Sequence, residues 1–149
     1  MPRRLLPLVV GALVAAAPLF AEKKVIVPPE FAPAPGAPVP MFSPAVLVDG
    51  TLYIAGQTGA DLKTGEIPAE FEAEVKTCLE RIRLVLKAAG MNYQDVVAVQ
   101  VYLTDMDLFA RMNAVYAGVF PAPRPARTTV GVARLVGKAH IEITVTARK

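Results

Sequence analysis

An arginine near the C-terminus has the chemical type and the setting of an anion-binding group. Arg127 lies in the segment 125–130, Pro-Ala-Arg-Thr-Thr-Val, where a proline-rich turn leads into an expected strand. Its neighbours restrict the backbone there, and a guanidinium can hold a carboxylate through two parallel hydrogen bonds. The alternative is a surface arginine paired with a nearby acid, which is the commoner situation for this residue type.

Glu142 is the second candidate, because it lies within the apolar alternation Ile-Glu-Ile-Thr-Val of residues 141–145. Successive side chains of a strand point to opposite faces, so Glu142 is expected on the face opposite the isoleucines. A carboxylate that faces a closed cleft can position or activate a water, whereas an open one is simply solvated. His140 is expected on the other face, as a surface or interface residue rather than a catalytic base.

Weaker candidates accompany these two. Gly56, before Gln57 at a strand end, would let a ligand approach the backbone closely. Asn113 and Tyr116 lie in an expected helix, where such residues usually pack or cap. Cys78 lies on the apolar face of another expected helix, which indicates a buried structural thiol rather than a nucleophile. One histidine and one cysteine are too few for a His/Cys metal cage, so we expect no metal.

The N-terminus has the pattern of an export signal. Two arginines precede an uncharged apolar run that extends to Phe20, and small residues then lead into a polar segment. This predicts a secretory signal peptide over residues 1–21, cleaved after Ala17 or Ala21, with an uncleaved anchor as the alternative. The run is shorter than a spanning helix needs. We therefore expect a periplasmic or secreted protein without stable membrane insertion after cleavage.

The charge of the chain argues against a nucleic-acid partner. The 149 residues contain 16 basic and 13 acidic side chains, a net charge of +3. Loss of residues 1–21 would remove two arginines and leave 14 basic against 13 acidic side chains, or +1. No stripe of lysine and arginine is present, and no aromatic run alternates with basic residues. A ribonuclease or other nucleic-acid-binding function therefore has little support.

A proline-rich segment precedes the expected domain. Seven of the 14 prolines lie between Pro28 and Pro44, which excludes a regular helix or a central strand there. We predict an extended leader over residues 22–40 and a single domain over 41–149. Whether the leader folds onto the domain stays open.

The first half of the domain predicts a hairpin followed by a helix. Strands are expected over 45–48 and 51–55, joined by an Asp-Gly turn of type I′. Apolar residues then recur at spacings of three and four, and Gly90 follows as the C-terminal stop of the predicted helix. This apolar stripe consists of Phe71, Val75, Cys78, Leu79, Ile82, Val85, Leu86 and Ala89.

The second half predicts a strand, a helix and two closing strands. The strand covers 96–103, with Val97, Val99, Val101 and Leu103 expected on one apolar face. We expect a helix that is capped at Thr104 or Asp105 and runs to about Phe120. The side chains expected to face the core are Leu108, Met112, Val115, Tyr116 and Val119. The closing strands are expected over 128–133 and 139–147. This order of elements predicts an α+β fold, in which two helices pack on one face of a sheet of about five strands. Self-association is one way to cover the other face.

Several collinear motifs together resemble one family, the RidA family (reactive intermediate deaminase, YjgF). The resemblance covers residues 41–148, nearly the whole expected domain. The motifs are the segments 52–59, 63–66, 88–91, 95–97, 101–106, 113–116, 125–130 and 141–143. The resemblance implies a chorismate-mutase-like α+β fold with a mixed sheet, assembled as a homotrimer with three ligand sites between subunits.

The resemblance also implies an activity. Members of the active type hydrolyse enamine/imine intermediates, small 2-imino acids, to 2-oxo acids and ammonia, without cofactor or metal. On that pattern Arg127 would bind the substrate carboxylate and Glu142 would orient the attacking water. Backbone groups at Gly56 and Thr129 would line the pocket, with Asn113 in support.

The chain departs from the family pattern near the implied pocket. Many members have a tyrosine where this chain has Phe42, so one hydroxyl is missing from the substrate site. A cysteine often found two residues after the arginine is Thr129 here. The expected export would also place the protein away from cytoplasmic pyridoxal enzymes. These departures keep open a second hypothesis, an exported protein that binds a small carboxylate in the same clefts without turning it over.

Overall fold

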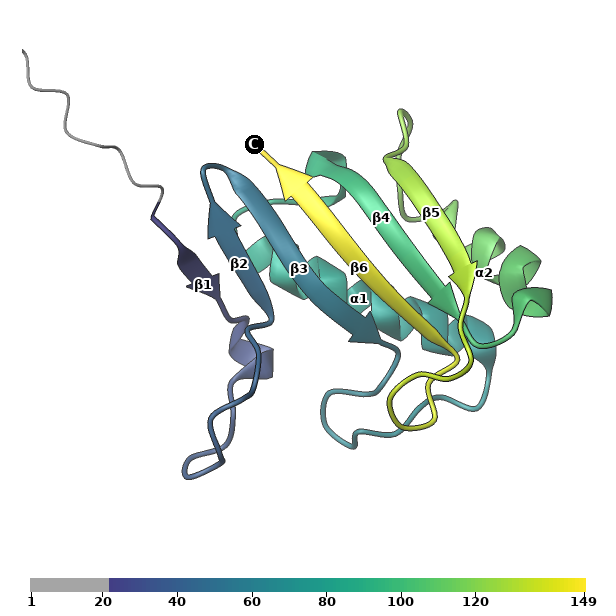
Figure 1. The fold of residues 1–149 in the computed structure, drawn as a ribbon, viewed down its shortest axis with the longest axis horizontal. Coiled ribbons are helices and arrows are strands. Elements are labelled where there is room, and N and C mark those ends of the chain that lie inside the picture. The colour runs from purple at the N-terminus through teal and green to yellow at the C-terminus, as the bar shows by residue number, and fades with distance from the viewer. Residues whose placement is uncertain (1–21) are drawn as a thin grey trace, which may run out of the picture.

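The computed structural model describes residues 22–149, which form one sheet backed by two helices (Figure 1). The predicted signal peptide over residues 1–21 lies outside the described residues. Among the helices of the described residues, none is both long and apolar enough to cross a membrane.

Six strands form the sheet, in the order β1-β2-β3-β6-β4-β5. All neighbouring pairs are antiparallel except β4 and β5, which are parallel. The strands are β1 (Lys24–Ile26), β2 (Ala45–Val48), β3 (Thr51–Thr58), β4 (Val96–Leu103), β5 (Ala126–Gly131) and β6 (Ile141–Arg148). The helices are α1 (Phe71–Ala88) and α2 (Phe109–Tyr116), with 3-10 turns at Pro29–Phe31, Tyr93–Asp95 and Met106–Leu108. The predicted α+β class with two helices on one face is confirmed.

The two clearest local predictions are confirmed. Asp49 and Gly50 join β2 to β3 with φ values of 48° and 72°, the positive pair that a type I′ turn requires. Gly90 has a φ of 70° just after α1, and its N–H donates to the carbonyl of Lys87 at 2.9 Å. The N–H of Met91 donates to the carbonyl of Leu86 at 2.8 Å, which completes a Schellman motif.

Both helices lie on one side of the sheet (Figure 1), and the buried core lies between them and that face. The predicted stripe of α1 is buried from Phe71 to Leu86 and packs against β3 and β6. From β6, Ile141, Ile143 and Val145 face this core, whereas the residues between them are half-buried on the opposite face. That opposite face has no covering layer among residues 22–149. We call it the open face.

The predicted boundary at Met41 does not mark the start of the fold. Residues 24–26 of the expected leader form β1, which pairs with residues 45–47 of β2. Ile26 is buried, and Phe31 packs against the core from the segment that follows. The leader therefore folds onto the domain.

The prediction that Val97 faces the core is wrong. A register shift between Val96 and Ala98 interrupts the pairing of β4 with β6, so Val96 is buried and Val97 is 49% exposed. An extra residue in one strand reverses the direction of the side chains that precede it. The apolar face resumes correctly with Val99.

Several predicted ends also shift. The strand predicted to end at Ala55 continues to Thr58, and the closing strands are Ala126–Gly131 and Ile141–Arg148 instead of 128–133 and 139–147. The second helix ends at Tyr116 rather than Phe120, because the N–H of Gly118 bonds back only three residues, to the carbonyl of Val115 at 3.2 Å. Asp105 caps the 3-10 turn that precedes this helix, accepting from the N–H of Asp107 at 2.8 Å.

Candidate functional site

Arg127 lies on β5, the edge strand at one side of the sheet. The parallel pairing places it beside Val99, whose side chain is in the core, so Arg127 points to the helix side. Its guanidinium carbon lies 4.5 Å from the ring centroid of Tyr116 and 5.7 Å from that of Phe109. Ring faces attract cations and fix the direction of the guanidinium. No carboxylate of residues 22–149 forms an ion pair with Arg127, so its charge is available to a ligand.

Two buried hydroxyls accompany this arginine. The Thr129 Oγ1 and the Tyr116 hydroxyl are buried and have no hydrogen-bond partner among the described residues. Burial raises the pKa of Tyr116, so it stays a neutral donor. Asn113 lies on α2 three residues before Tyr116, which places both on one side of the helix. Buried polar groups without partners are rare in folded proteins, and their concentration here indicates a surface that binds a polar group.

Glu142 lies on the open face, as predicted. Its register neighbours are Thr58 on β3 and Tyr102 on β4. The side chain lies against the backbone of Gly56: a Cβ atom at that glycine would be 2.8 Å from Glu142 Cδ and closer still to Oε1. The glycine leaves the space that the carboxylate occupies.

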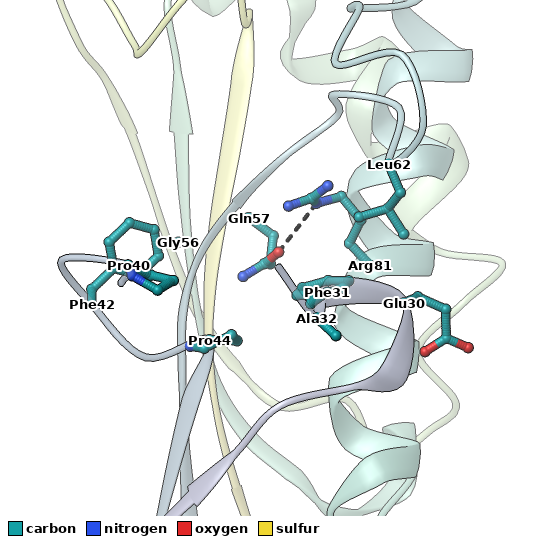
Figure 2. Close-up of a pocket in the computed structure, with 10 residues that line it drawn as sticks. All are labelled: Glu30, Phe31, Ala32, Pro40, Phe42, Pro44, Gly56, Gln57, Leu62 and Arg81. Atoms are coloured by element: carbon teal, nitrogen blue, oxygen red, sulfur yellow. Dashed lines mark hydrogen bonds between the residues drawn. The ribbon is translucent and has the colours of Figure 1, made fainter. Parts of the chain in front are cut away.

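The glycine lies in an irregular part of β3. The pairing of β3 with β6 shifts register between Ile54 and Gln57, so Gly56 falls in a bulge. Phe42, from the segment before β2, lines the same hollow as Gly56 and is 69% exposed (Figure 2). A second hollow is lined by Glu142 and by Arg134, from the loop between β5 and β6.

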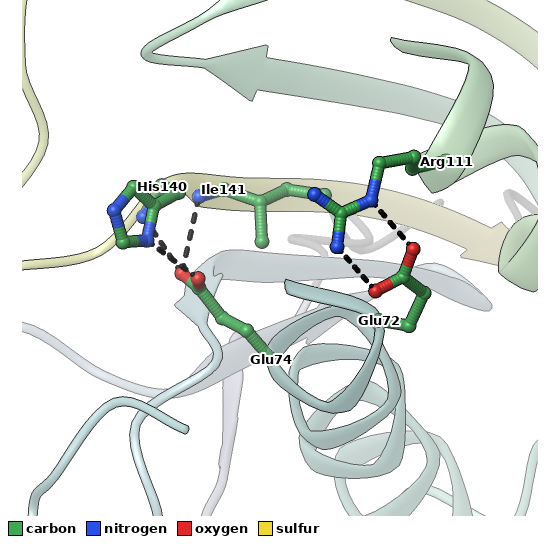
Figure 3. Close-up of polar contacts among 5 residues, drawn as sticks. All are labelled: Glu72, Glu74, Arg111, His140 and Ile141. Carbon is green, nitrogen blue, oxygen red and sulfur yellow. Dashed lines mark hydrogen bonds and ion pairs between the residues drawn. The ribbon is translucent and has the colours of Figure 1, made fainter. Parts of the chain in front are cut away.

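A buried carboxylate anchors the start of β6 (Figure 3). Glu74 of α1 is 0% exposed and accepts hydrogen bonds from the backbone N–H groups of His140 at 2.7 Å and Ile141 at 3.3 Å. The His140 Nδ1 lies 2.8 Å from the other Glu74 oxygen. These bonds tie the strand that carries Glu142 to α1. They also direct the His140 imidazole toward Glu74 of α1.

The six predicted site residues therefore fall into two groups. Arg127, Thr129 and Asn113 lie on the helix side at the β5 edge. Glu142 lies against Gly56 near the start of β6 and the end of β3, and Phe42 lines a hollow with Gly56. We call these the arginine half-site and the glutamate half-site.

The two half-sites cannot meet on one small molecule within a single chain. Arg127 and Glu142 point to opposite faces of the sheet. Strand β4 also lies between β5 and β6, a separation of about 10 Å across the sheet. A site that uses both residues needs two copies of the chain.

Sequence reasoning missed parts of both half-sites. Tyr116 was expected only to pack, although it stacks under Arg127. The contact of Phe109 with Arg127 could not be predicted from the sequence. It exists because β5 pairs in parallel with β4, which places β5 beside α2. Arg134 lies in an irregular loop, where no periodicity relates it to Glu142.

Comparison with known proteins identifies the family. A family model described as endoribonuclease L-PSP matches residues 32–149. A RutC family protein of Pyrococcus horikoshii is 43% identical over 113 residues, 75% of this chain and 90% of the relative. A 2-iminobutanoate/2-iminopropanoate deaminase of Bos taurus is 42% identical over 113 residues, 75% of this chain and 82% of the relative.

Solved structures agree in fold. RidA from an Antarctic Psychrobacter has a TM-score of 0.76 at 36% identity, over 85% of this chain and 99% of the other. The structure of TdcF from E. coli with bound serine has a TM-score of 0.73 at 30% identity, over 85% and 98%. The motifs, the sheet order and these similarities lead to one conclusion: this chain belongs to the RidA family.

Proposed function

We propose that this protein hydrolyses small 2-imino acids to 2-oxo acids and ammonia. The observation that carries the proposal is the pair of half-sites. One is a guanidinium beside two buried hydroxyls, which have no partner among residues 22–149, and the other is a carboxylate that lies against a glycine. Both suit the hydrolysis of a 2-imino acid, because a cation binds its carboxylate and a base activates the attacking water. Relatives about 40% identical carry the name of this activity, and serine, bound by TdcF, likewise has a carboxylate beside a nitrogen-bearing carbon.

The proposed chemistry uses only groups of this chain. Arg127 binds the substrate carboxylate through its fork. Glu142 accepts a proton from a water as the water oxygen bonds to the imine carbon and the C=N π electrons move to nitrogen. Protons then pass to that nitrogen, the C–N bond breaks and ammonia leaves as the C=O bond forms. An imine is already electrophilic, so positioning it beside an oriented water supplies much of the acceleration.

The half-sites are proposed to join between subunits of a homotrimer. In a ring of three chains each interface is head-to-tail, so the arginine half-site of one chain can face the glutamate half-site of the next. The open face provides the surface for such an assembly, because Tyr53 and Val130 leave apolar side chains exposed on it.

Mixing two inactive variants tests the shared site directly. Arg127→Ala and Glu142→Gln are each expected to clear imine poorly alone. When the two variants are refolded together in equal amounts, the chains of each ring are drawn at random. Half of the chains have a native Arg127 and half have a native Glu142, so about one interface in four combines both native residues. Activity close to a quarter of the wild-type value supports the proposal. If the mixture is no more active than the single variants, the two residues do not act across one interface.

The activity assay couples an amino-acid oxidase to the purified residues 22–149 and follows the decay of the 2-imino acid. Arg127→Ala is expected to lower kcat/KM by roughly 30-fold or more, because the carboxylate loses a charge-assisted pair of hydrogen bonds. Arg124→Ala, an exposed arginine three residues earlier, is the matched control and is expected to keep full activity. Wild-type protein that clears imine no faster than Arg127→Ala would end the proposal.

One observation favours a second candidate, binding without turnover. Phe42 has no hydroxyl to hold substrate or water at the glutamate half-site. In that case calorimetry with a 2-oxo acid would show binding that depends on Arg127, while the imine decays at its uncatalysed rate.

Export is part of the proposal and is tested separately. We propose that residues 1–21 direct the chain out of the cytoplasm and are removed. N-terminal sequencing of the protein from its native host, after fractionation, is expected to begin after Ala17 or Ala21. A cytoplasmic protein that begins at residue 1 or 2 would refute this part alone.

A further inference from the structure

A hollow of about 320 Å³ lies under the proline-rich leader, where the leader crosses the end of β3 (Figure 2). The volume suits a small organic molecule. Its walls come from the leader, from the β3 bulge, from α1 and from the loop that follows β3. The lining residues are Glu30, Phe31, Ala32, Pro40, Phe42, Pro44, Gly56, Gln57, Leu62 and Arg81. Except for Phe42 and Gly56, these belong to neither half-site.

Arg81 supplies the one cationic side chain of this hollow, and neutral groups hold it in place. Its Nε donates to the Gln57 side-chain oxygen at 3.2 Å, and its Nη1 donates to the Ala60 carbonyl at 3.2 Å. The Gln57 amide is itself held, because its Nε2 donates to the Ala55 carbonyl at 3.0 Å. The Phe31 ring covers the guanidinium at 4.8 Å. The orientation of the fork is therefore set before any ligand arrives.

The charge of this arginine is not compensated by the described residues. No carboxylate among residues 22–149 forms an ion pair with Arg81, and its Nη2 makes no hydrogen bond there. Partial burial lowers the pKa of Arg81, as expected for a cation removed from water without an anion. Glu30 also lines the hollow, but Figure 2 shows its carboxylate directed away from the guanidinium.

We infer that this hollow is a second binding site, for a small organic carboxylate with an apolar body. The free edge of the Arg81 fork would take the carboxylate, since a guanidinium and a carboxylate match in geometry. Phe31, Phe42 and Leu62 would contact the apolar part. The site is contained within one chain and does not depend on the proposed activity.

The hollow shares two residues with the glutamate half-site. Gly56 and Phe42 line the hollow and also belong to that half-site. A molecule in the hollow would press on the backbone segment against which the Glu142 carboxylate lies. Occupancy of the hollow is therefore expected to alter the glutamate half-site without competing for Arg127.

Benzoate is the probe, because it combines one carboxylate with an apolar ring. The titration uses residues 22–149 carrying Arg127→Ala, so that the arginine half-site cannot contribute. Calorimetry is expected to show one benzoate per chain, and adding Arg81→Gln is expected to weaken binding by about tenfold or more. Absence of binding in Arg127→Ala, or equal binding in the double variant, overturns the inference.

Matched variants exclude indirect effects. Arg83→Gln removes an exposed arginine of the same helix that is already paired with Glu80, and it should leave benzoate affinity unchanged. Glu30→Gln should leave it unchanged or raise it slightly. If benzoate binds only after Glu30→Gln, Glu30 is the true partner of Arg81 and no ligand site exists.

A second measurement avoids any dependence on the folding of an Arg81 variant. Crystals of Arg127→Ala soaked in 4-bromobenzoate should give an anomalous bromine peak in the hollow, with the carboxylate on Arg81. A peak elsewhere, or none at saturating probe, contradicts the inference. Imine decay is measured on wild-type protein and benzoate binding on Arg127→Ala. A failure of benzoate to bind therefore does not affect the proposed function, and a failure of imine hydrolysis does not affect the inference about the hollow.

Discussion

Replacing Gly56 by alanine should separate catalysis from stability. An added Cβ would lie 2.8 Å from Glu142 Cδ and 3.2 Å from Cγ, and closer still to Oε1. All three atoms belong to a half-buried side chain that can turn away. Gly56 is not among the glycines with positive φ, so alanine brings no backbone strain.

The size of the effect follows from these distances. To reach ordinary van der Waals separation the carboxyl group has to retreat by roughly 1 Å. A displacement of that size in a catalytic group lowers the rate by about 10²-fold. The rotamer change costs about 1 kcal/mol at most, and alanine recovers about half of that through lower backbone entropy in the unfolded chain. We therefore expect kcat to fall about 100-fold with a nearly unchanged free energy of unfolding.

Gly59→Ala provides the contrast. A Cβ at Gly59 would lie 2.9 Å from the Glu74 carbonyl carbon and closer still to its oxygen and Cγ. The obstacle there is helix backbone, so α1 has to move, at a cost of about 1–3 kcal/mol. Imine decay and urea unfolding are measured for both variants. If Gly56→Ala keeps wild-type kcat while Glu142→Gln loses it, the carboxylate does not act from the position against Gly56.

Three further outcomes are expected. Glu74→Gln should destabilise the fold by about 2 kcal/mol in urea unfolding, because the amide nitrogen of glutamine cannot accept the hydrogen bonds that the buried Glu74 carboxyl accepts from the backbone. Glu72→Gln, on an exposed pair, should leave the unfolding midpoint unchanged at neutral pH. Burial raises the pKa of the Cys78 thiol, so iodoacetamide at pH 8 should label it only in denaturant, as followed by mass spectrometry; labelling of folded protein would contradict its burial. Phe42→Tyr should raise kcat/KM about fivefold by restoring one hydrogen bond, and an unchanged value would show that the hydroxyl is not needed here.

Local elements of the fold could be predicted because their signals are contained in short windows. The hairpin at Asp49 and Gly50 depends on two adjacent residues, and α1 depends on a stripe that repeats every three or four positions. The strand at residues 24–26 could not be predicted in this way. It has only three residues, and pairing with β2 and the burial of Ile26 stabilise it rather than any pattern of its own.

The candidate site was predictable by residue type but not by arrangement. Alternation along β6 places Glu142 on the open face, and this needs no tertiary information. The side to which Arg127 points depends on its pairing with Val99. Neither strand has a sequence pattern that predicts this parallel pairing. The bulge at Gly56 and the shift before Ala98 each add one residue to a strand, and periodicity alone does not locate them.

The division of Arg127 and Glu142 between two faces has a consequence for a solitary molecule. On the proposed chemistry a monomer is inactive, because its guanidinium and its carboxylate lie on different sides of the sheet. Activity then requires the association of folded chains. Specific activity should consequently fall on dilution below the concentration at which neighbours separate, and recover when the sample is concentrated again.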